Sequence, residues 1–137
     1  MTEPLHEGGC LCGAVRYRAV AEPVALTRCH CRSCRLASGA PSVAWAVFPA
    51  HAFAFVTGAP RLFHSSSGVS RGFCGKCGTS LTWQRDAVAD TVDVTSATLD
   101  HADAFAPLHE IWVEHKLAWE TLDPALPQHP RSSVGND

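Results

Sequence analysis

The residues best suited to chemistry in this chain are its seven cysteines, which lie in three short groups. The groups have the spacings C-x-C, C-x-C-x-x-C and C-x-x-C, and they consist of Cys10 and Cys12; Cys29, Cys31 and Cys34; and Cys74 and Cys77. A structural zinc ion takes four thiolate or imidazole ligands in a tetrahedron, and a close pair supplies two of them from one turn. Because an odd number of cysteines cannot all form disulfides, the clustered spacing favours metal binding.

The first and third groups are pairs, and together they provide the four ligands of one closed zinc site. Gly13 and Gly78 follow these pairs, and glycine tolerates the positive φ with which a turn directs its amides toward sulfur. The middle group offers three thiolates, and three protein ligands with one exchangeable position are typical of a reactive zinc site. We therefore expect two zinc ions per chain: a structural ion at Cys10, Cys12, Cys74 and Cys77, and a catalytic ion at Cys29, Cys31 and Cys34.

Two other interpretations of the middle group remain open. A histidine would supply a fourth ligand and make this site structural too, the candidates being His30, His64, His109 and His115. His30 lies between two ligands in an extended turn, so we expect its side chain to point away from the metal, as a neighbour of the site or an exposed group. Alternatively, Cys31 and Cys34 form a redox dithiol, which needs a βαβ context.

The elements that must position these groups are predominantly β-strands. Side chains alternate between apolar and polar at 14–20 and 42–48, and further short runs occur at 53–56, 61–65, 69–73, 79–84, 91–95 and 111–114. This spacing predicts an antiparallel, mainly β protein. Helix is expected only at 32–38 and at 100–105, where Asp100 is the predicted N-cap. With 137 residues we expect one domain.

Composition excludes several classes of function. The chain has 11 Lys and Arg against 13 Asp and Glu, a net charge of −2, and no basic cluster, so we expect no nucleic-acid partner. Its longest apolar run, 43–48, is far shorter than the ~20 residues of a membrane helix, and no membrane role is expected. The first residues lack the pattern of a secretion signal, so we expect a cytoplasmic protein. The sequence contains no pattern that predicts the oligomeric state.

Four segments of the sequence resemble a known family. Residues 8–17, 29–34, 37–40 and 73–79 read GGCLCGAVRY, CHCRSC, ASGA and FCGKCGT. They are similar to the motifs of the glutathione-dependent formaldehyde-activating enzymes, a family that also includes centromere protein V. The resemblance extends from about residue 8 to about residue 127, so we expect the domain at 8–127, an N-terminal tail at 1–7 and a C-terminal tail at 128–137. It implies a β-tent fold with minimal helix and two zinc ions, the outer pairs holding the structural ion and the middle group the catalytic one.

The resemblance also implies a reaction, the joining of glutathione and formaldehyde to S-hydroxymethylglutathione or its reversal by a carbon–sulfur lyase. A zinc ion held by three thiolates is a weaker Lewis acid than one held by neutral histidines, so water activation is not its natural task. A substrate thiol can instead take the fourth position, lose its proton and attack a small carbonyl carbon. We expect glutathione or a similar thiol and a small aldehyde as partners.

Several neighbours of the middle group are candidate substrate-binding residues. The arginines are placed to offset negative charge or to bind the carboxylates of glutathione, and a hydroxyl near Gly39 would face a developing oxyanion; these candidates are Arg28, Arg32, Arg35 and Ser38. Solvent-exposed arginines and a simple helix-ending turn would explain the same residues. Likewise Trp45, Trp112 and Trp119 would wall a pocket over the zinc or simply pack in the core.

The rival function is a zinc-stabilised binding module without catalytic turnover. Centromere protein V in the same family favours such a role, with protein or nucleic acid as the partner. A nucleic-acid module should however show clustered Lys and Arg with interleaved aromatic residues. This sequence, with a pI of about 6.4, has neither feature.

Overall fold

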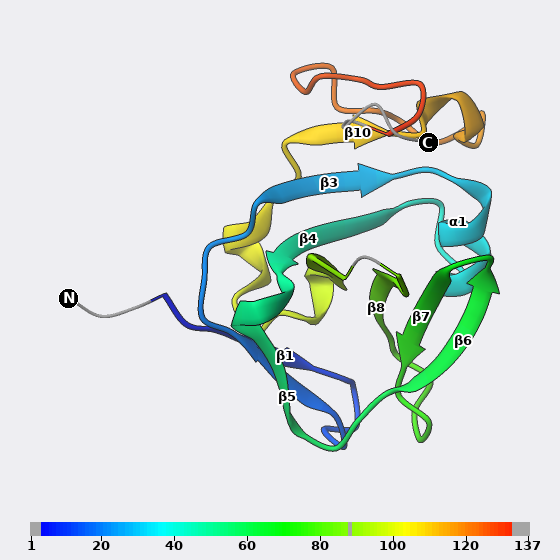
Figure 1. The fold of residues 1–137 in the computed structure, drawn as a ribbon. Coiled ribbons are helices and arrows are strands. Elements are labelled where there is room, and N and C mark those ends of the chain that lie inside the picture. Colours follow the sequence, from blue (N-terminus) through cyan, green and yellow to red (C-terminus); the bar gives the residue numbers. More distant parts are fainter. Residues whose placement is uncertain (1–3, 88, 133–137) are drawn as a thin grey trace.

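The computed structural model describes residues 4–87 and 89–132. Of the expected N-terminal tail, residues 1–3 lie outside the described residues, and His6 and Glu7 belong to a strand. Residues 133–137 of the expected C-terminal tail also lie outside the described residues. Within the described part, ten strands form two sheets and one α-helix, α1 (Arg32–Ser38), joins two strands (Figure 1). The predicted mainly β class with minimal helix is confirmed.

The smaller sheet has three antiparallel strands in the order β1 (His6–Gly9), β2 (Arg16–Ala19) and β5 (Phe53–Thr57). The two glycines that end β1 give it little intrinsic strand preference. They are required by packing, because a side chain at Gly8 would collide with the hydroxyl of Tyr17, its cross-strand partner. Tyr17 is fully buried and hydrogen-bonds Thr98 Oγ1 at 2.7 Å. This contact ties the small sheet to the rest of the molecule.

The larger sheet has seven strands. Their order is β10 (His109–Ile111), β3 (Ala25–Cys29), β4 (Val43–Pro49), β9 (Thr91–Thr95), β8 (Ser80–Arg85), β7 (Val69–Phe73) and β6 (Arg61–Ser66). Neighbouring strands are antiparallel except for β10 and β3, which run parallel. The expected antiparallel arrangement therefore holds for every pair of neighbouring strands among the described residues except this one at the edge. There the long connection from β9, rather than a hairpin, brings the chain back beside β3.

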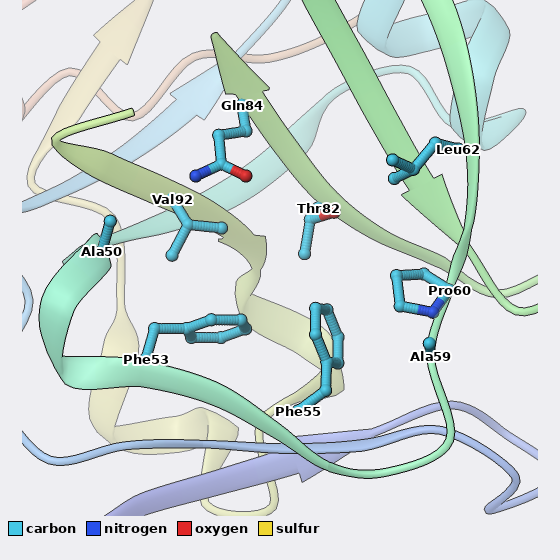
Figure 2. A pocket seen from close by; sticks show the side chains of 9 residues that line it. All are labelled: Ala50, Phe53, Phe55, Ala59, Pro60, Leu62, Thr82, Gln84 and Val92. Carbon is cyan, nitrogen blue, oxygen red and sulfur yellow. The ribbon is translucent and has the colours of Figure 1, made fainter. Parts of the chain in front are cut away.

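The main core lies where the two sheets face each other. Tyr17, Phe48, Leu81 and Val94 are its fully buried large side chains. Between β5 and β8 the packing leaves a mainly apolar hollow of about 380 Å³, where Phe53 and Phe55 face Val92 and Thr82 (Figure 2). This hollow has no cysteine in its lining, so it is separate from both cysteine clusters.

All but one of the expected strands are present, with ends shifted by one or two residues. The strand expected at 111–114 is wrong, because pairing with β3 ends at Ile111 and a 3₁₀ turn, Val113–His115, follows. The expected helix at 100–105 is a 3₁₀ turn, Ala102–Phe105, preceded by His101. Asp100 is not its cap, because its carboxylate is engaged by the guanidinium of Arg16.

Pairing continues past the expected domain bounds on both sides. His6 and Glu7 belong to β1, and Gln128 forms a bridge with Glu110. In the part of the chain that the structure describes, no helix has the length and apolar character needed to cross a membrane.

Candidate metal centre

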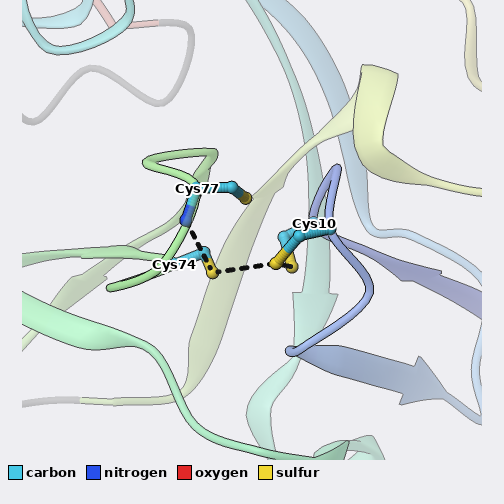
Figure 3. A group of neighbouring side chains, drawn as sticks. Cys10, Cys74 and Cys77 are labelled. Atoms are coloured by element: carbon cyan, nitrogen blue, oxygen red, sulfur yellow. Dashed lines mark hydrogen bonds between the residues drawn. The ribbon is translucent and has the colours of Figure 1, made fainter.

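The outer cysteine pairs meet between the two sheets. Cys10 and Cys12 lie on the turn between β1 and β2, and Cys74 and Cys77 lie on the turn between β7 and β8, so the pairs face each other (Figure 3). All four sulfur atoms lie within 4.8 Å of one another. The Sγ atoms of Cys10 and Cys12 are 3.7 Å apart and those of Cys12 and Cys74 are 3.8 Å apart. A tetrahedron with Zn–S bonds of ~2.3 Å has an edge of about 3.8 Å, so this donor set fits zinc.

Both turns direct donors at their sulfur atoms. The amide of Val15 donates to Cys10 Sγ at 3.3 Å, and the amide of Cys77 donates to Cys74 Sγ at 3.4 Å. Gly13 and Gly78 have φ of +80° and +81°, which confirms the expected need for glycine after each pair. The hydroxyl of Thr79, 3.2 Å from Cys77 Sγ, lowers the pKa of that thiol to about 5. These donors stabilise thiolates, the form that binds metal.

The middle cysteines gather where β3 ends and α1 begins. Cys29 is the last residue of β3, Cys31 is the N-cap of α1, and Cys34 lies in the first turn of that helix. Their sulfur atoms lie within 4.8 Å of one another, and Cys29 and Cys34 are buried. Contact with the Cys29 thiol lowers the pKa of Cys31, while the same contact raises the pKa of Cys29. Three such sulfurs become thiolates together only around a cation.

The short helix α1 positions two of these ligands, Cys31 and Cys34. Cys31 Sγ accepts the amide of Cys34 at 3.3 Å, as an N-cap side chain does. The helix ends where Gly39 takes a left-handed φ of +66°. Ser38 donates its hydroxyl to the carbonyl of Cys34 at 2.7 Å. Because β3 and β4 on either side of the helix are antiparallel, the βαβ context that the redox-dithiol interpretation needs is not present here.

The three-thiol group has no fourth ligand of the same kind among the described residues. The histidines considered for that place have other partners. His30 Nε2 lies 2.8 Å from Glu110 Oε1, His64 Nδ1 lies 3.0 Å from the Ser70 hydroxyl, and His109 bonds His129 at 3.0 Å. His115 stacks on Trp112, with ring centroids 5.7 Å apart. The geometry thus matches three protein ligands and one open position.

A buried ion-pair network lies beneath this group. Glu110 on β10 is fully buried and accepts hydrogen bonds from the guanidinium of Arg28, from His30 and from the amide of Asp123 at 2.7 Å. Burial by itself raises the pKa of Glu110, but these donors outweigh it and lower the pKa to about 2. His30 points away from the sulfurs as expected, yet it is buried rather than exposed. The network fixes the Cys29–Cys31 segment from below.

The four candidate substrate-binding residues have different surroundings in the structure. The guanidinium of Arg28 is engaged by Glu110 and by the carbonyl of Thr121, on the side of β3 opposite to Cys29. Arg32 is exposed at the start of α1. Arg35 is half-buried, and its Nε has no hydrogen-bond partner among the described residues. The exposed Ser38 points its hydroxyl back to the helix.

Sequence reasoning missed Arg71, the arginine that contacts the three-thiol group. It lies on β7, is 8% exposed, and places Nη1 and Nη2 at 3.8 and 3.7 Å from Cys34 Sγ. Its Nε donates to the Ser65 hydroxyl at 3.2 Å, which holds the guanidinium in place. Its positive charge adds to the lowering of the Cys31 pKa. The available signal was an arginine in the middle of a short predicted strand, three residues before Cys74.

Three tryptophans pack around the three-thiol group, and they differ from the three expected in that Trp83 takes the place of Trp119. Trp45 is buried beside Cys29 and Cys34, and Trp83 and Trp112 pack against the same cluster. Trp119 is 71% exposed and takes no part in this wall. Trp112 has φ of +57°, the only positive value among the described residues other than glycine. Such strain persists where surrounding contacts enforce it, and Arg131 stacked on the indole at 5.7 Å is one of them.

Comparison with known proteins gives three findings. An uncharacterized lyase of Schizosaccharomyces pombe is 35% identical over 78 residues, which are 57% of this chain and 56% of that relative, so the chain spans little more than half its length. A crystal structure of a Rhodobacter sphaeroides protein matches with a TM-score of 0.58 at 24% identity, over 69% of this chain and 88% of that one, and shows likeness of fold. The family profile of the glutathione-dependent formaldehyde-activating enzymes matches residues 5–115. The chain therefore belongs to this family.

Proposed function

We propose that this protein is a zinc-dependent carbon–sulfur lyase that activates glutathione or a similar thiol for addition to, or release from, formaldehyde or another small carbonyl. The observation that carries the proposal is the contrast between the two cysteine clusters. One offers four thiols, which fill a tetrahedron, and the other offers three and no fourth ligand among the described residues. The family and the lyase relative support the same class of reaction.

In the forward reaction the thiol loses its proton and the sulfur attacks the carbonyl carbon. The new carbon–sulfur bond sends the electron pair of the C=O bond to oxygen, which then takes up one proton. In reverse the hydroxyl loses that proton, the carbonyl forms again and the sulfur leaves. A zinc ion held by Cys29, Cys31 and Cys34 supplies the open position at which a thiol becomes more acidic.

The chain's own residues prepare this position. Three thiolates around one divalent ion leave a negative site, and a substrate thiolate makes it more negative. The buried guanidinium of Arg71 beside Cys34 Sγ offsets that charge. Trp45, Trp83 and Trp112 cover the cluster and limit the access of water, which strengthens this electrostatic interaction. The second ion, at the four-thiol cluster, has a structural role in this proposal.

The structure leaves fewer candidates for substrate contacts than the sequence did. Arg32 and Arg35 on α1 remain the proposed anchors for the carboxylates of glutathione, because their helix carries two of the ligands. We propose that Arg28 positions the metal-binding segment through Glu110 instead of binding substrate. Ser38 is a proposed oxyanion donor only if its hydroxyl leaves the carbonyl of Cys34.

The alternative function is a zinc-stabilised binding module without turnover. The arginine contact to Cys34 weighs against it, since a purely structural ion needs no charge beside an incomplete ligand set. We place the protein in the cytoplasm, where thiols stay reduced, and propose no nucleic-acid or membrane partner. Its oligomeric state does not enter the proposal.

Metal analysis and exchange measurements test the proposal together. Protein purified without added zinc should contain two equivalents, and one equivalent would contradict the assignment of two ions. Exchange of glutathione and formaldehyde with their adduct is then followed by NMR for the wild type, Cys31→Ser and the exposed neighbour control Ser33→Ala. We expect the wild type and the control to accelerate exchange and Cys31→Ser to match buffer. Equal rates in all samples would refute the glutathione assignment.

A further inference from the structure

One face of the larger sheet carries a row of side chains that leads away from the three-thiol group. Asp93 on β9 is directly opposite Trp83 on β8, and Trp83 is directly opposite Arg71 on β7. Directly opposed residues of antiparallel strands lie on the same face, with Cβ atoms ~5 Å apart. Arg71 contacts Cys34 Sγ, and Trp83 packs against the cysteine cluster. Asp93 therefore lies on the face that holds the three thiols.

The carboxylate of Asp93 has no hydrogen-bonding or ion-pair partner among the described residues that would account for a charged group at this position. Its side chain is half-buried, and it makes no hydrogen bond or ion pair with any other residue that the structure describes. An unpaired carboxylate that is removed from water destabilises a fold. An unpaired, half-buried carboxylate on the sheet face that also holds the three thiols is a candidate for proton transfer.

The charges around Asp93 come from two arginines on the same face of the sheet. Arg85, on β8, stacks over Trp83 at 5.6 Å and, with Arg71, favours the ionised carboxylate. From β4 the facing residue is Val47, which carries no charge. Burial outweighs both arginines and raises the pKa of Asp93 to about 7. A general base works best with a pKa near the working pH.

We propose that Asp93 accepts the proton that the substrate thiol releases and returns it to the carbonyl oxygen once the carbon–sulfur bond has formed. This inference rests on the proposed function. In the forward direction one proton leaves sulfur, resides on the Asp93 carboxylate, and ends on the new hydroxyl group, so no other acid or base is consumed. In reverse Asp93 takes the hydroxyl proton and gives it to the departing sulfur.

Three other ionisable groups close to the thiols are less suited to this proton transfer. Arg71 stays protonated at any working pH. Glu110 is fully buried and saturated by donors, and His30 is bonded to it on the far side of the ligand segment. Asp93 is the acidic group in this row that keeps both carboxylate oxygens free of other described residues.

The first test compares Asp93→Asn with Asp90→Asn, which changes an exposed aspartate immediately before β9. Both variants should retain the zinc content of the wild type. We expect the rate of adduct formation to fall by roughly 10²-fold or more in Asp93→Asn and to be unchanged in Asp90→Asn. The wild-type rate should decline as the pH falls through about 7, and Asp93→Asn should lack this step. A rate and pH profile like the wild type's in Asp93→Asn would overturn the proposal.

The second test measures proton release without turnover. Glutathione binding to the zinc-loaded proteins at pH 7.5 is followed by calorimetry in buffers of different ionisation enthalpy. A thiol with a pKa near 8.5 is mostly protonated at this pH, so a site without an acceptor releases about one proton per thiol bound. We expect Asp93→Asn to release about one, and the wild type and Asp90→Asn clearly fewer. Equal release by all three overturns the role of Asp93 alone, whereas failure of the wild type to bind glutathione overturns the proposed function and this inference with it.

Discussion

Replacement of Glu110 by glutamine tests whether the buried network beneath the three-thiol group stabilises the fold. Glutamine keeps the size of the side chain but removes the charge that Arg28 and His30 face. Donors lower the pKa of Glu110 from 4.5 to about 2 despite its burial. Since one pKa unit corresponds to ~1.4 kcal/mol, the ionised carboxylate contributes about 3 kcal/mol to the free energy of unfolding at pH 7.

The sign of the pH dependence follows from the direction of the shift. A carboxyl group whose pKa is lowered on folding stabilises the protein above its ordinary pKa, and this contribution is lost as the pH falls toward the folded value. The difference between wild type and Glu110→Gln should therefore be about 3 kcal/mol at pH 7 and should shrink between pH 5 and pH 2. Protonation of the thiolates affects both proteins and cancels in this difference.

Urea denaturation monitored by tryptophan fluorescence, with zinc present, measures the effect. The matched control is Glu114→Gln, which removes a carboxylate whose ion pair with Arg131, at 2.8 Å, is exposed. An exposed pair contributes only ~0–1 kcal/mol, so the control should change stability little. A double-mutant cycle with Arg28→Gln then isolates the pair. A loss below ~1 kcal/mol for Glu110→Gln at pH 7, or a loss that does not vary with pH, would refute the reasoning.

Three further predictions follow from the same structure. Cys77→Ser should lower the melting temperature strongly, whereas Cys34→Ser should mainly remove one zinc equivalent and the activity; equal destabilisation by both would mean that both ions are structural. Arg71→Gln should weaken zinc binding roughly 10- to 100-fold, measured by competition with a chromogenic chelator, and unchanged affinity would contradict its charge-balancing role. Because burial raises the pKa of Asp93 to about 7, its ionisation destabilises the fold as the pH rises, by up to about 4 kcal/mol. Asp93→Asn should then gain thermal stability over the wild type between pH 5 and pH 8, and a constant difference would contradict the raised pKa.

The metal-binding residues could be predicted from sequence because their information is local. Ligands spaced C-x-C or C-x-x-C lie on one turn, so the grouping survives any uncertainty about the strands. Trp83 and Arg71 could not be placed beside Cys34 in the same way. They reach it through the register of β7 and β8, and a shift of one residue would turn them to the other face.

The missed strands have a similar explanation. β1 has two glycines in four residues, and its strand conformation depends on pairing with β2 and on close packing with Tyr17. In β3 the alternation is masked because Arg28 is drawn inward by Glu110, a residue more than eighty positions later. The parallel pairing of β3 with β10 has no local signature, since the connection between them includes most of the chain.

The arrangement of the two cysteine clusters sets the order in which a newly made chain can acquire its metal ions. Cys29, Cys31 and Cys34 lie within six residues, so they can hold an ion before any sheet has formed. The Cys12–Cys74 contact instead closes a loop across 62 positions, and its entropy must be offset by strands already in place. The open site can therefore load early, as a local event of synthesis, while binding at the closed site marks the end of folding.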